Sequence, residues 1–139
     1  MSYLLDTNVV SETIKPAANA GVSKFLSEAD EDQLYLSVVS LAELHYGIQR
    51  LERGAKRGRL EKWFADDLLA RFERRIFLMD GMAAAEWGVI MARGERMGRP
   101  ISEMDAWIAA TAAIHGMTIV TRNVGDFAAH EGKLLNPWE

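Results

Sequence analysis

Short apolar runs alternate with longer segments of helical spacing along the whole chain. The apolar runs have the length of short strands and cover residues 3–5, 34–38, 76–79 and 117–120. The segments between them carry apolar residues at helical intervals, which predicts helices over 22–29, 40–51, 56–72, 83–97 and 104–115. Strands that alternate with helices form a mostly parallel sheet with helices on both faces. The pattern therefore predicts an α/β fold with its site at the carboxyl ends of the strands.

The last of these helices is marked at both ends. Ser102, with Asp105 three residues later, is typical of an amino-terminal helix cap. The pair His115-Gly116 is typical of the opposite end, because glycine readily adopts the left-handed conformation that closes a helix. Asp105 is therefore expected one turn inside a helix.

The size and composition of the chain predict one domain over residues 1–139. Of its 139 residues, 49% are hydrophobic, which is enough for a single core, and no repeat or linker divides them. The lack of cysteine excludes disulfides and thiolate metal sites and is typical of a reducing compartment. No apolar stretch approaches the roughly 18 residues of a membrane span, and the first residues lack the basic segment of a signal peptide. We therefore expect a cytoplasmic protein without membrane association.

The charge is unevenly distributed along the chain. A net charge of −4 argues against a protein that coats nucleic acid through bulk positive charge. Residues 50–75, however, hold nine of the sixteen Lys and Arg residues against five acids, and the remainder of the chain carries −8. This asymmetry predicts either a basic rim beside an acidic pocket or a solvated helix face of mixed charge.

Two acidic residues stand at positions that favour a site. Asp6 directly follows the apolar run 3–5, so it is either a site residue at a strand end or the cap of the next helix. Glu43 lies beside the apolar stripe of its helix, with the small residues Ser40 and Gly47 one turn to either side. These neighbours leave room for a ligand, and an exposed helical glutamate is the alternative.

Asp105 is the most informative of the acids. On its helix it shares the apolar side with Ile101, Ile108, Ala109 and Ala112. A carboxylate that faces a core is costly unless it is paired, hydrogen-bonded or bound to a metal. A favourable interaction with the helix dipole is the alternative, but it does not explain the small neighbours.

Further polar residues follow the apolar run 117–120. Asn123 and Asp126 are each either a ligand or a helix cap. Acids placed at strand ends and helix starts of one α/β domain converge on the same crevice. Pooled carboxylates repel one another and take up protons unless a cation lies among them. Oxygen ligands without cysteine or histidine favour Mg²⁺ or Mn²⁺ over zinc.

Four blocks of residues in this order resemble the motifs of the PIN-domain family. The blocks are Leu4 to Val9, Ser40 to Leu44, Met104 to Ala112, and Thr121 to Asn123 with Asp126-Phe127. Their order and spacing resemble the VapC-type toxins of bacterial toxin–antitoxin pairs, especially the FitB-like branch, whose final segment resembles Asn136-Pro137-Trp138. The resemblance spans essentially the whole chain.

The resemblance implies a fold, an activity and partners. The implied fold is a three-layer α/β/α sandwich with a mostly parallel central sheet. The implied activity is Mg²⁺-dependent endoribonuclease cleavage, with Mn²⁺ as a substitute ion. The implied partners are an RNA substrate, a second copy of the chain in a homodimer, and a small antitoxin with which the chain assembles into a DNA-binding complex.

The resemblance also implies roles for individual residues. Asp6, Glu43 and Asp105 match the three acidic positions of the family and would be catalytic residues and metal ligands. Some members carry an acid where this chain has Asn123, and others carry it where this chain has Asp126, so both are candidates for the fourth ligand. Asp126 would also be a catalytic residue. Residues that would contact these ligands or the RNA phosphate are Thr7, Asn8, Ser40 and Thr121.

We therefore expect a toxin ribonuclease in which the ion activates a water for phosphodiester hydrolysis. Asp6 and Asp105 are expected to hold the ion chiefly, and Glu43 to contact it directly or through water. The basic residues of 50–75 would either steer the RNA or face an antitoxin or solvent. Alternatives are a non-catalytic subunit of a DNA-binding repressor complex and a housekeeping PIN ribonuclease. A phospho-receiver or phosphohydrolase with an Asp nucleophile would require another acid close to Asp6, where Thr7 and Asn8 stand.

Two apolar stretches are expected docking surfaces for an antitoxin. They lie around Trp63-Phe64 and over residues 83–91, and each carries a tryptophan. An amphipathic segment laid into such a groove would bring a basic side chain to the acidic cluster. Ordinary core packing or a dimer interface is the alternative for both stretches.

Overall fold

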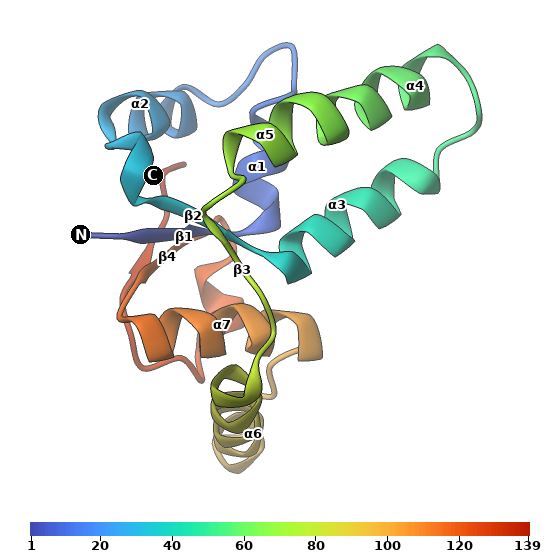
Figure 1. Ribbon diagram of the computed structural model, residues 1–139. Helices are drawn as coiled ribbons and strands as arrows, with labels where there is room; N and C mark the ends of the chain where they lie inside the picture. The colour runs from blue at the N-terminus through green and yellow to red at the C-terminus, as the bar shows by residue number, and fades with distance from the viewer.

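Five short parallel strands run through the centre of the fold, as seen in a computed structural model that describes residues 1–139 (Figure 1). They are β1 (Tyr3–Leu5), β2 (Leu34–Ser37), β3 (Ile76–Phe77), β4 (Thr118–Val120) and β5 (Leu134–Leu135). Their order across the sheet is β3-β2-β1-β4-β5, so β1 lies between β2 and β4 and pairs with both. The chain builds the sheet outward from β1 in both directions. Such a reversal leaves a crevice at the carboxyl ends of the two central strands, β1 and β4.

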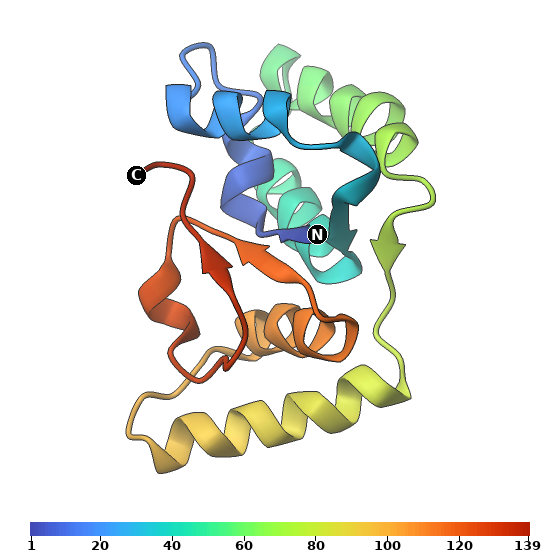
Figure 2. The same ribbon diagram turned by 90° about the vertical axis from the view of Figure 1, so that its left-hand side faces the viewer.

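Helices cover both faces of this sheet. They are α1 (Thr7–Glu12), α2 (Ala20–Glu28), α3 (Val38–Gln49), α4 (Ala55–Lys62), α5 (Leu69–Arg71), α6 (Gly81–Arg96) and α7 (Glu103–His115). A π-helical turn (Trp63–Leu68) joins α4 to α5, and two 3-10 turns occupy Glu31–Gln33 and Val124–Phe127. Figures 1 and 2 show α6 and α7 on one side of the strands and α1, α2, α4 and α5 on the other. None of the helices combines the length and the apolar character that crossing a membrane requires.

Side chains that alternate along the central strands build two separate cores. Leu4 and Ile119 belong to the cluster that packs against α6 and α7. Their neighbours Leu5 and Val120 point to the opposite face and belong to the cluster that packs against α1, α2, α3 and the segment 63–72. Both faces of the sheet are therefore buried, which confirms the expected three-layer α/β/α sandwich with a parallel sheet.

The predicted elements differ from the observed ones mainly at short segments. All four predicted strands occur, but β2 ends at Ser37, because its hydroxyl accepts a hydrogen bond from the Val39 amide and caps α3. Residue 38 is therefore helical, which corrects the predicted strand over 34–38. The predicted helix over 56–72 is interrupted by the π-helical turn. Helix α1 and strand β5 were missed because six and two residues are too short for a periodic signal.

Both predicted ends of α7 are confirmed. The Ser102 hydroxyl accepts a hydrogen bond of 3.2 Å from the Asp105 amide, and Asp105 lies in the first turn. Gly116 closes the helix in the left-handed conformation, with φ of 63°.

The segment Asn136–Trp138 packs closely against the start of α2. A Cβ atom added at Gly21 would lie 2.1 Å from the Pro137 carbonyl oxygen, so only glycine allows this approach. The Asn19 side chain caps α2 at the same place by accepting hydrogen bonds from the Gly21 and Val22 amides. This packing fixes the segment beside the carboxyl end of β4.

Gly21→Ala is therefore expected to destabilise the protein by about 1–3 kcal/mol, because the new methyl group must displace a backbone carbonyl. Gly58→Ala is the matched control: Gly58 lies inside α4 with no atom near an added Cβ, so alanine should be neutral or stabilise by up to about 1 kcal/mol. Urea unfolding followed by circular dichroism compares the two variants. Equal stability of the Gly21→Ala variant and the wild type would contradict the close approach.

Candidate active site

A polar cavity of about 370 Å³ opens at the carboxyl ends of β1 and β4. This volume lies in the usual range for ligand-binding sites. Asp6, Glu43 and Asp105 all line the cavity, although they come from a strand end and two different helices. The other lining residues are Thr7, Asn8, Ser11, Glu12, Lys15, Arg122, Asn123 and Trp138. The fold thus brings the three sequence-predicted acids to one place.

Asp6 is buried at the junction of β1 and α1. Its Oδ1 accepts a hydrogen bond of 2.8 Å from the Thr7 amide and caps α1, while its Oδ2 accepts one of 2.8 Å from the Thr121 hydroxyl. Burial raises the pKa of Asp6, the hydrogen bonds from Thr121 and Thr7 lower it, and the charge of Asp126 raises it. Asp6 therefore both caps the helix and lines the cavity, so the two interpretations of its position are compatible.

Thr7 connects Asp6 to Glu43. Its hydroxyl donates a hydrogen bond of 2.7 Å to Glu43 Oε1, while its amide is bonded to Asp6. Glu43 is half-buried on α3, and this helix packs against α1. One threonine thus orients carboxylates that are 37 positions apart in the sequence.

Thr121 has the same function on the other side of Asp6. It is fully buried, and its hydroxyl donates to Asp6 Oδ2 while accepting hydrogen bonds from Asn8 Nδ2 (3.3 Å) and the Asn123 amide (3.0 Å). Asn8 Nδ2 also lies 3.4 Å from Asp6 Oδ2. The residues predicted to support the ligands therefore hold one of them through a connected network.

Asp105 has a more strongly raised pKa than Asp6. It is half-buried, and its pKa is raised to about 6. Burial is the largest cause, the negative charges of Asp6, Glu43 and Asp126 act in the same direction, and a hydrogen bond with Ser102 acts against them. These causes show that the carboxylates lie close enough to repel one another.

The two candidates for the fourth ligand differ in charge and position. Asn123 lines the cavity, and its side chain makes no capping hydrogen bond. Asp126 is exposed on the following 3-10 turn and lines an adjoining polar cavity together with Asp105. Its charge raises the pKa of both Asp6 and Asp105. Both residues therefore lie near the three carboxylates and stay candidates for the fourth ligand.

Ser40 does not fit one of its two expected roles. It is fully buried on α3, and its hydroxyl has no hydrogen-bond partner. A phosphate group of RNA cannot reach a side chain without solvent access, so contact with the substrate is excluded. The small side chain is better explained by close packing of α3 than by binding.

The basic residues of 50–75 do not form one free patch. Arg71 and Arg75 both bind Glu31, with N–O distances of 2.8 Å, and their hydrogen bonds lower the pKa of Glu31 to about 2. Arg57 lies within 3.7 Å of Glu61 and donates a hydrogen bond to the Gln49 side chain. Three of the basic residues expected to steer RNA therefore bind other parts of the protein instead.

Several cavity residues were missed by sequence reasoning. Ser11, Glu12 and Lys15 were overlooked because α1, on and just after which they lie, was not predicted. Arg122 and Trp138 stand inside or beside the recognised motif blocks, but nothing in the pattern showed that they face the acids. Their adjacency depends on the positions of β4 and β5 in the sheet.

The donor atoms fit a hard divalent cation chemically. All the acidic side chains in and beside the cavity offer oxygen, the ligand that Mg²⁺ and Mn²⁺ prefer, and no histidine lines it. A cation would also relieve the repulsion that raises the pKa of Asp105. The side chains do not form a closed cage, however, because no three Asp, Glu or His residues are grouped tightly enough to hold one ion.

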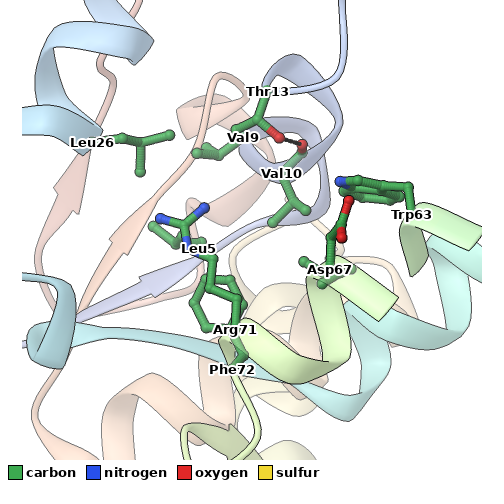
Figure 3. A pocket seen from close by; sticks show the side chains of 10 residues that line it. Leu5, Val9, Val10, Thr13, Leu26, Trp63, Asp67, Arg71 and Phe72 are labelled. Carbon is green, nitrogen blue, oxygen red and sulfur yellow. Dashed lines mark hydrogen bonds between the residues drawn. The ribbon is translucent and has the colours of Figure 1, made fainter. Parts of the chain in front are cut away.

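An apolar cavity of about 120 Å³ lies apart from the carboxylates, between α1, α2 and the segment Trp63–Phe72 (Figure 3). Leu5, Val9 and Val10 form its floor, and Asp67 and Arg71 are the charged residues that line it. These polar groups do not converge on a point, and neither residue contacts the acidic cluster. This cavity therefore has no role in the chemistry of the site.

Known proteins resemble this chain in sequence and in structure. The pattern of the family described as PIN domain matches residues 3–132. Toxin FitB of Neisseria gonorrhoeae is 36% identical over 135 residues, which cover 97% of each protein. VapC ribonuclease Y4jK of Sinorhizobium fredii is 32% identical over 136 residues, covering 98% of this chain and 97% of that protein. In the solved structure of FitAB bound to an IR36 DNA fragment, one chain matches with a TM-score of 0.94 at 36% identity, covering 99% of this chain and 96% of that one.

The electrostatics of the metal-free cavity give a pH-dependent stability. The pKa of Asp105 is raised from 3.8 to about 6, so the folded protein binds this proton more tightly than the unfolded chain does. The resulting contribution to the free energy of unfolding is fully present below pH 3.8 and is lost as the pH rises through about 6. Asp105→Asn should therefore stabilise the protein at about pH 8, by roughly 1 kcal/mol after solvent screening, and have little effect at about pH 4. Thermal unfolding in EDTA should show a Tm higher by about 2–4 °C at the upper pH only. Asp66→Asn, at an exposed position outside the cavity, is the control. An equal effect of Asp105→Asn at both pH values would contradict this electrostatic origin.

Proposed function

The chain belongs to the PIN-domain family, and we propose that it is a divalent-metal-dependent endoribonuclease that acts as the toxin of a type II toxin–antitoxin pair. The observation that carries this proposal is the convergence of Asp6, Glu43 and Asp105 on one cavity. The names of its relatives, toxin FitB and VapC ribonuclease Y4jK, support the same activity. Intact acids at all three positions disfavour a non-catalytic subunit.

The proposed chemistry divides among the cavity residues. Mg²⁺ or Mn²⁺, when bound, supplies a water of lowered pKa and offsets negative charge at the phosphate. Asp6 and Asp105 hold the ion, and Glu43, oriented by Thr7, acts directly or through water. Thr121 keeps Asp6 in position through its hydrogen bond to Oδ2.

We assign the fourth metal position to Asp126. A carboxylate contributes charge as well as an oxygen, which an amide such as Asn123 does not. The influence of Asp126 on the pKa of both Asp6 and Asp105 supports this assignment, because it indicates that all three carboxylates share one electrostatic environment. Asn123 would then contact the substrate or a metal-bound water.

An apolar groove supports docking of an antitoxin segment. It runs between α1, α3 and α4 and is lined by Ile14, Leu44, Ile48, Leu51, Leu60 and Trp63. Thr7 and Glu43 also line it, so the groove leads to the acidic cavity. A basic side chain of an amphipathic segment in this groove would reach Glu43 and compete with the ion. The other predicted docking stretch, residues 83–91, is largely used to pack α6 on α7, where Trp87 stacks on Trp107.

A second copy of the chain is the proposed partner of an exposed apolar face. Leu78 and Met79, just before α6, are 70% and 52% exposed, and Met82 and Val89 on α6 are 70% and 47% exposed. Exposed apolar side chains grouped in this way are typical of protein interfaces.

We further propose that the dimer assembles with the antitoxin into a DNA-binding complex, as the solved FitAB–DNA structure supports. A ribonuclease that acts on cellular RNA would work in the cytoplasm, and a chain without cysteine is compatible with its reducing conditions.

Asp6→Asn and Asp105→Asn are each expected to abolish RNA cleavage while leaving the fold intact, because each removes a charged metal ligand. Cleavage of a labelled RNA by the purified variants, with Mn²⁺ and with EDTA, measures this loss. Asp66→Asn should keep wild-type activity, and EDTA should inactivate the wild type reversibly. Activity above about a tenth of wild type in either cavity variant would contradict the assignment of Asp6 and Asp105 as metal ligands.

Expression of the chain alone is expected to arrest bacterial growth, because a free toxin ribonuclease degrades cellular RNA. Co-expression of the neighbouring small reading frame should restore growth. The Asp105→Asn variant should be harmless and still co-purify with the same partner. Growth curves and affinity purification measure both effects.

A wild-type chain that cleaves RNA in vitro but is innocuous at high expression would contradict the toxin role. A housekeeping ribonuclease would then be the better description. Loss of co-purification in the Asp105→Asn variant would instead show that the partner depends on this carboxylate.

A further inference from the structure

We propose that Trp138, Arg122 and Lys15 form a nucleotide subsite beside the carboxylates. In this subsite an unpaired RNA base stacks against the Trp138–Arg122 pair, and the adjoining phosphate binds the two cations. The inference rests on the proposed ribonuclease function and names the residues that would hold one nucleotide of its substrate beside the carboxylates.

These three residues line the same cavity as the acids but come from separate parts of the chain. Lys15 follows α1, Arg122 follows β4, and Trp138 follows β5. The order of the strands places β4 beside β1 and β5 beside β4, so all three side chains lie at the carboxyl edge of the sheet. The cavity thus has an aromatic and cationic part in addition to its acidic part.

Trp138 is held in place before any ligand binds. Its amide donates a hydrogen bond of 3.0 Å to Asn136 Oδ1, and Asn136 Nδ2 donates one of 3.4 Å to the Arg122 carbonyl. The preceding Pro137 is buried and lies against Gly21, which has no Cβ to interfere. The indole packs partly on the core and remains partly exposed. A ring fixed in this way presents a stacking surface at little cost in conformational entropy.

Arg122 supplies unused hydrogen-bond donors next to this ring. Its guanidinium carbon lies 5.5 Å from the centre of the Trp138 ring, and its amide donates to Asn8 Oδ1. The side chain is exposed, and none of the five ion pairs of the structure includes it. A planar guanidinium both stacks on bases and binds phosphate with two parallel hydrogen bonds.

Lys15 adds a second positive charge whose position is fixed. Its Nζ lies 2.9 Å from Glu12 Oε1, and 55% of the Lys15 side chain is exposed. Glu12 is buried and also accepts a hydrogen bond from the Asn19 amide, so it anchors the lysine at the cavity. The hydrogen bond with Lys15 is the main cause of the lowered pKa of Glu12, to which Arg122 contributes.

The charges of the cavity require such a subsite for an anionic substrate. Asp6, Glu43 and Asp105 repel a phosphodiester, and a bound ion offsets only part of this repulsion. The charge of Lys15 is paired with that of Glu12, so Arg122 supplies the unpaired positive charge and Lys15 supplies hydrogen-bond donors at the same cavity. Bases in a duplex are covered on both faces by their neighbours, so stacking on the Trp138–Arg122 pair selects an unpaired nucleotide.

The test measures RNA binding by the full chain in an Asp105→Asn background, which prevents cleavage. The probe is a labelled single-stranded RNA of about ten nucleotides and mixed sequence, and fluorescence anisotropy gives its Kd. Trp138→Ala and Arg122→Ala should each weaken binding by roughly tenfold, the loss typical of one stacked base. Arg96→Ala, at an exposed arginine on α6, is the control and should bind as the background does.

A second probe separates stacking from charge. An RNA of the same length that lacks its bases should bind equally to the Trp138→Ala variant and to the background, whereas Arg122→Ala should still weaken its binding. Circular dichroism checks the fold of each variant. If Trp138→Ala unfolds the chain, Trp138→Leu keeps the apolar packing without the aromatic face, and Trp138→Phe should restore binding.

The outcomes distinguish the subsite from the proposed function. If the wild-type chain cleaves RNA but the Trp138 and Arg122 variants bind like Arg96→Ala, the subsite is wrong and the ribonuclease stands. If these variants lose RNA binding but the wild-type chain cleaves no RNA with Mn²⁺, the subsite stands and the function is wrong. If they lose only the antitoxin in co-purification, the surface serves a polypeptide and the subsite is overturned.

Discussion

Repulsion between neighbouring carboxylates is the constraint on which the rest of this structure depends. Asp6, Glu43 and Asp105 line one cavity, and burial together with the neighbouring negative charges raises the pKa of Asp105 to about 6. A fold that only needed stability would separate these acids or replace them. Their convergence at the switch point of a parallel sheet therefore costs stability, and the cation of the proposed function would relieve this cost.

The surrounding hydrogen bonds offset part of this cost and determine the geometry. Thr7 bonds to both Asp6 and Glu43, and Thr121 bonds to Asp6 from the end of β4. Thr121 directly follows β4, and Thr7 begins α1 one residue beyond the end of β1. The backbone at both places is held by strand pairing, because the Asp6 amide donates to the Val120 carbonyl and the Thr121 amide to the Leu135 carbonyl. The rigidity of the sheet is in this way transmitted to the carboxylates without any bond between the acids themselves.

The sequence singled out two of the acids that line the cavity because each of them interrupts an apolar pattern. Asp6 ends a strand run and Asp105 lies on the apolar side of a helix, so both were visible without the structure. Ser40 was expected at the site because of its spacing from Glu43, but spacing alone cannot distinguish a cavity wall from a helix interior. The short elements α1 and β5 were invisible to periodicity, and with them the position of Lys15 and Trp138.

The strand order that brings the acids together also places a positively charged side chain beside them. β1 and β4 lie side by side, so the residues after β4 include Thr121, which holds Asp6, and Arg122, which faces the same cavity. β5 pairs with β4 and brings Trp138 next to Arg122. An acidic cavity alone would bind cations and exclude RNA. The cavity has acids after β1 and on α3 and α7, and it has an arginine beside an indole after β4 and β5. In the proposed function, an ion and an RNA phosphate would therefore each meet charges of opposite sign within one opening.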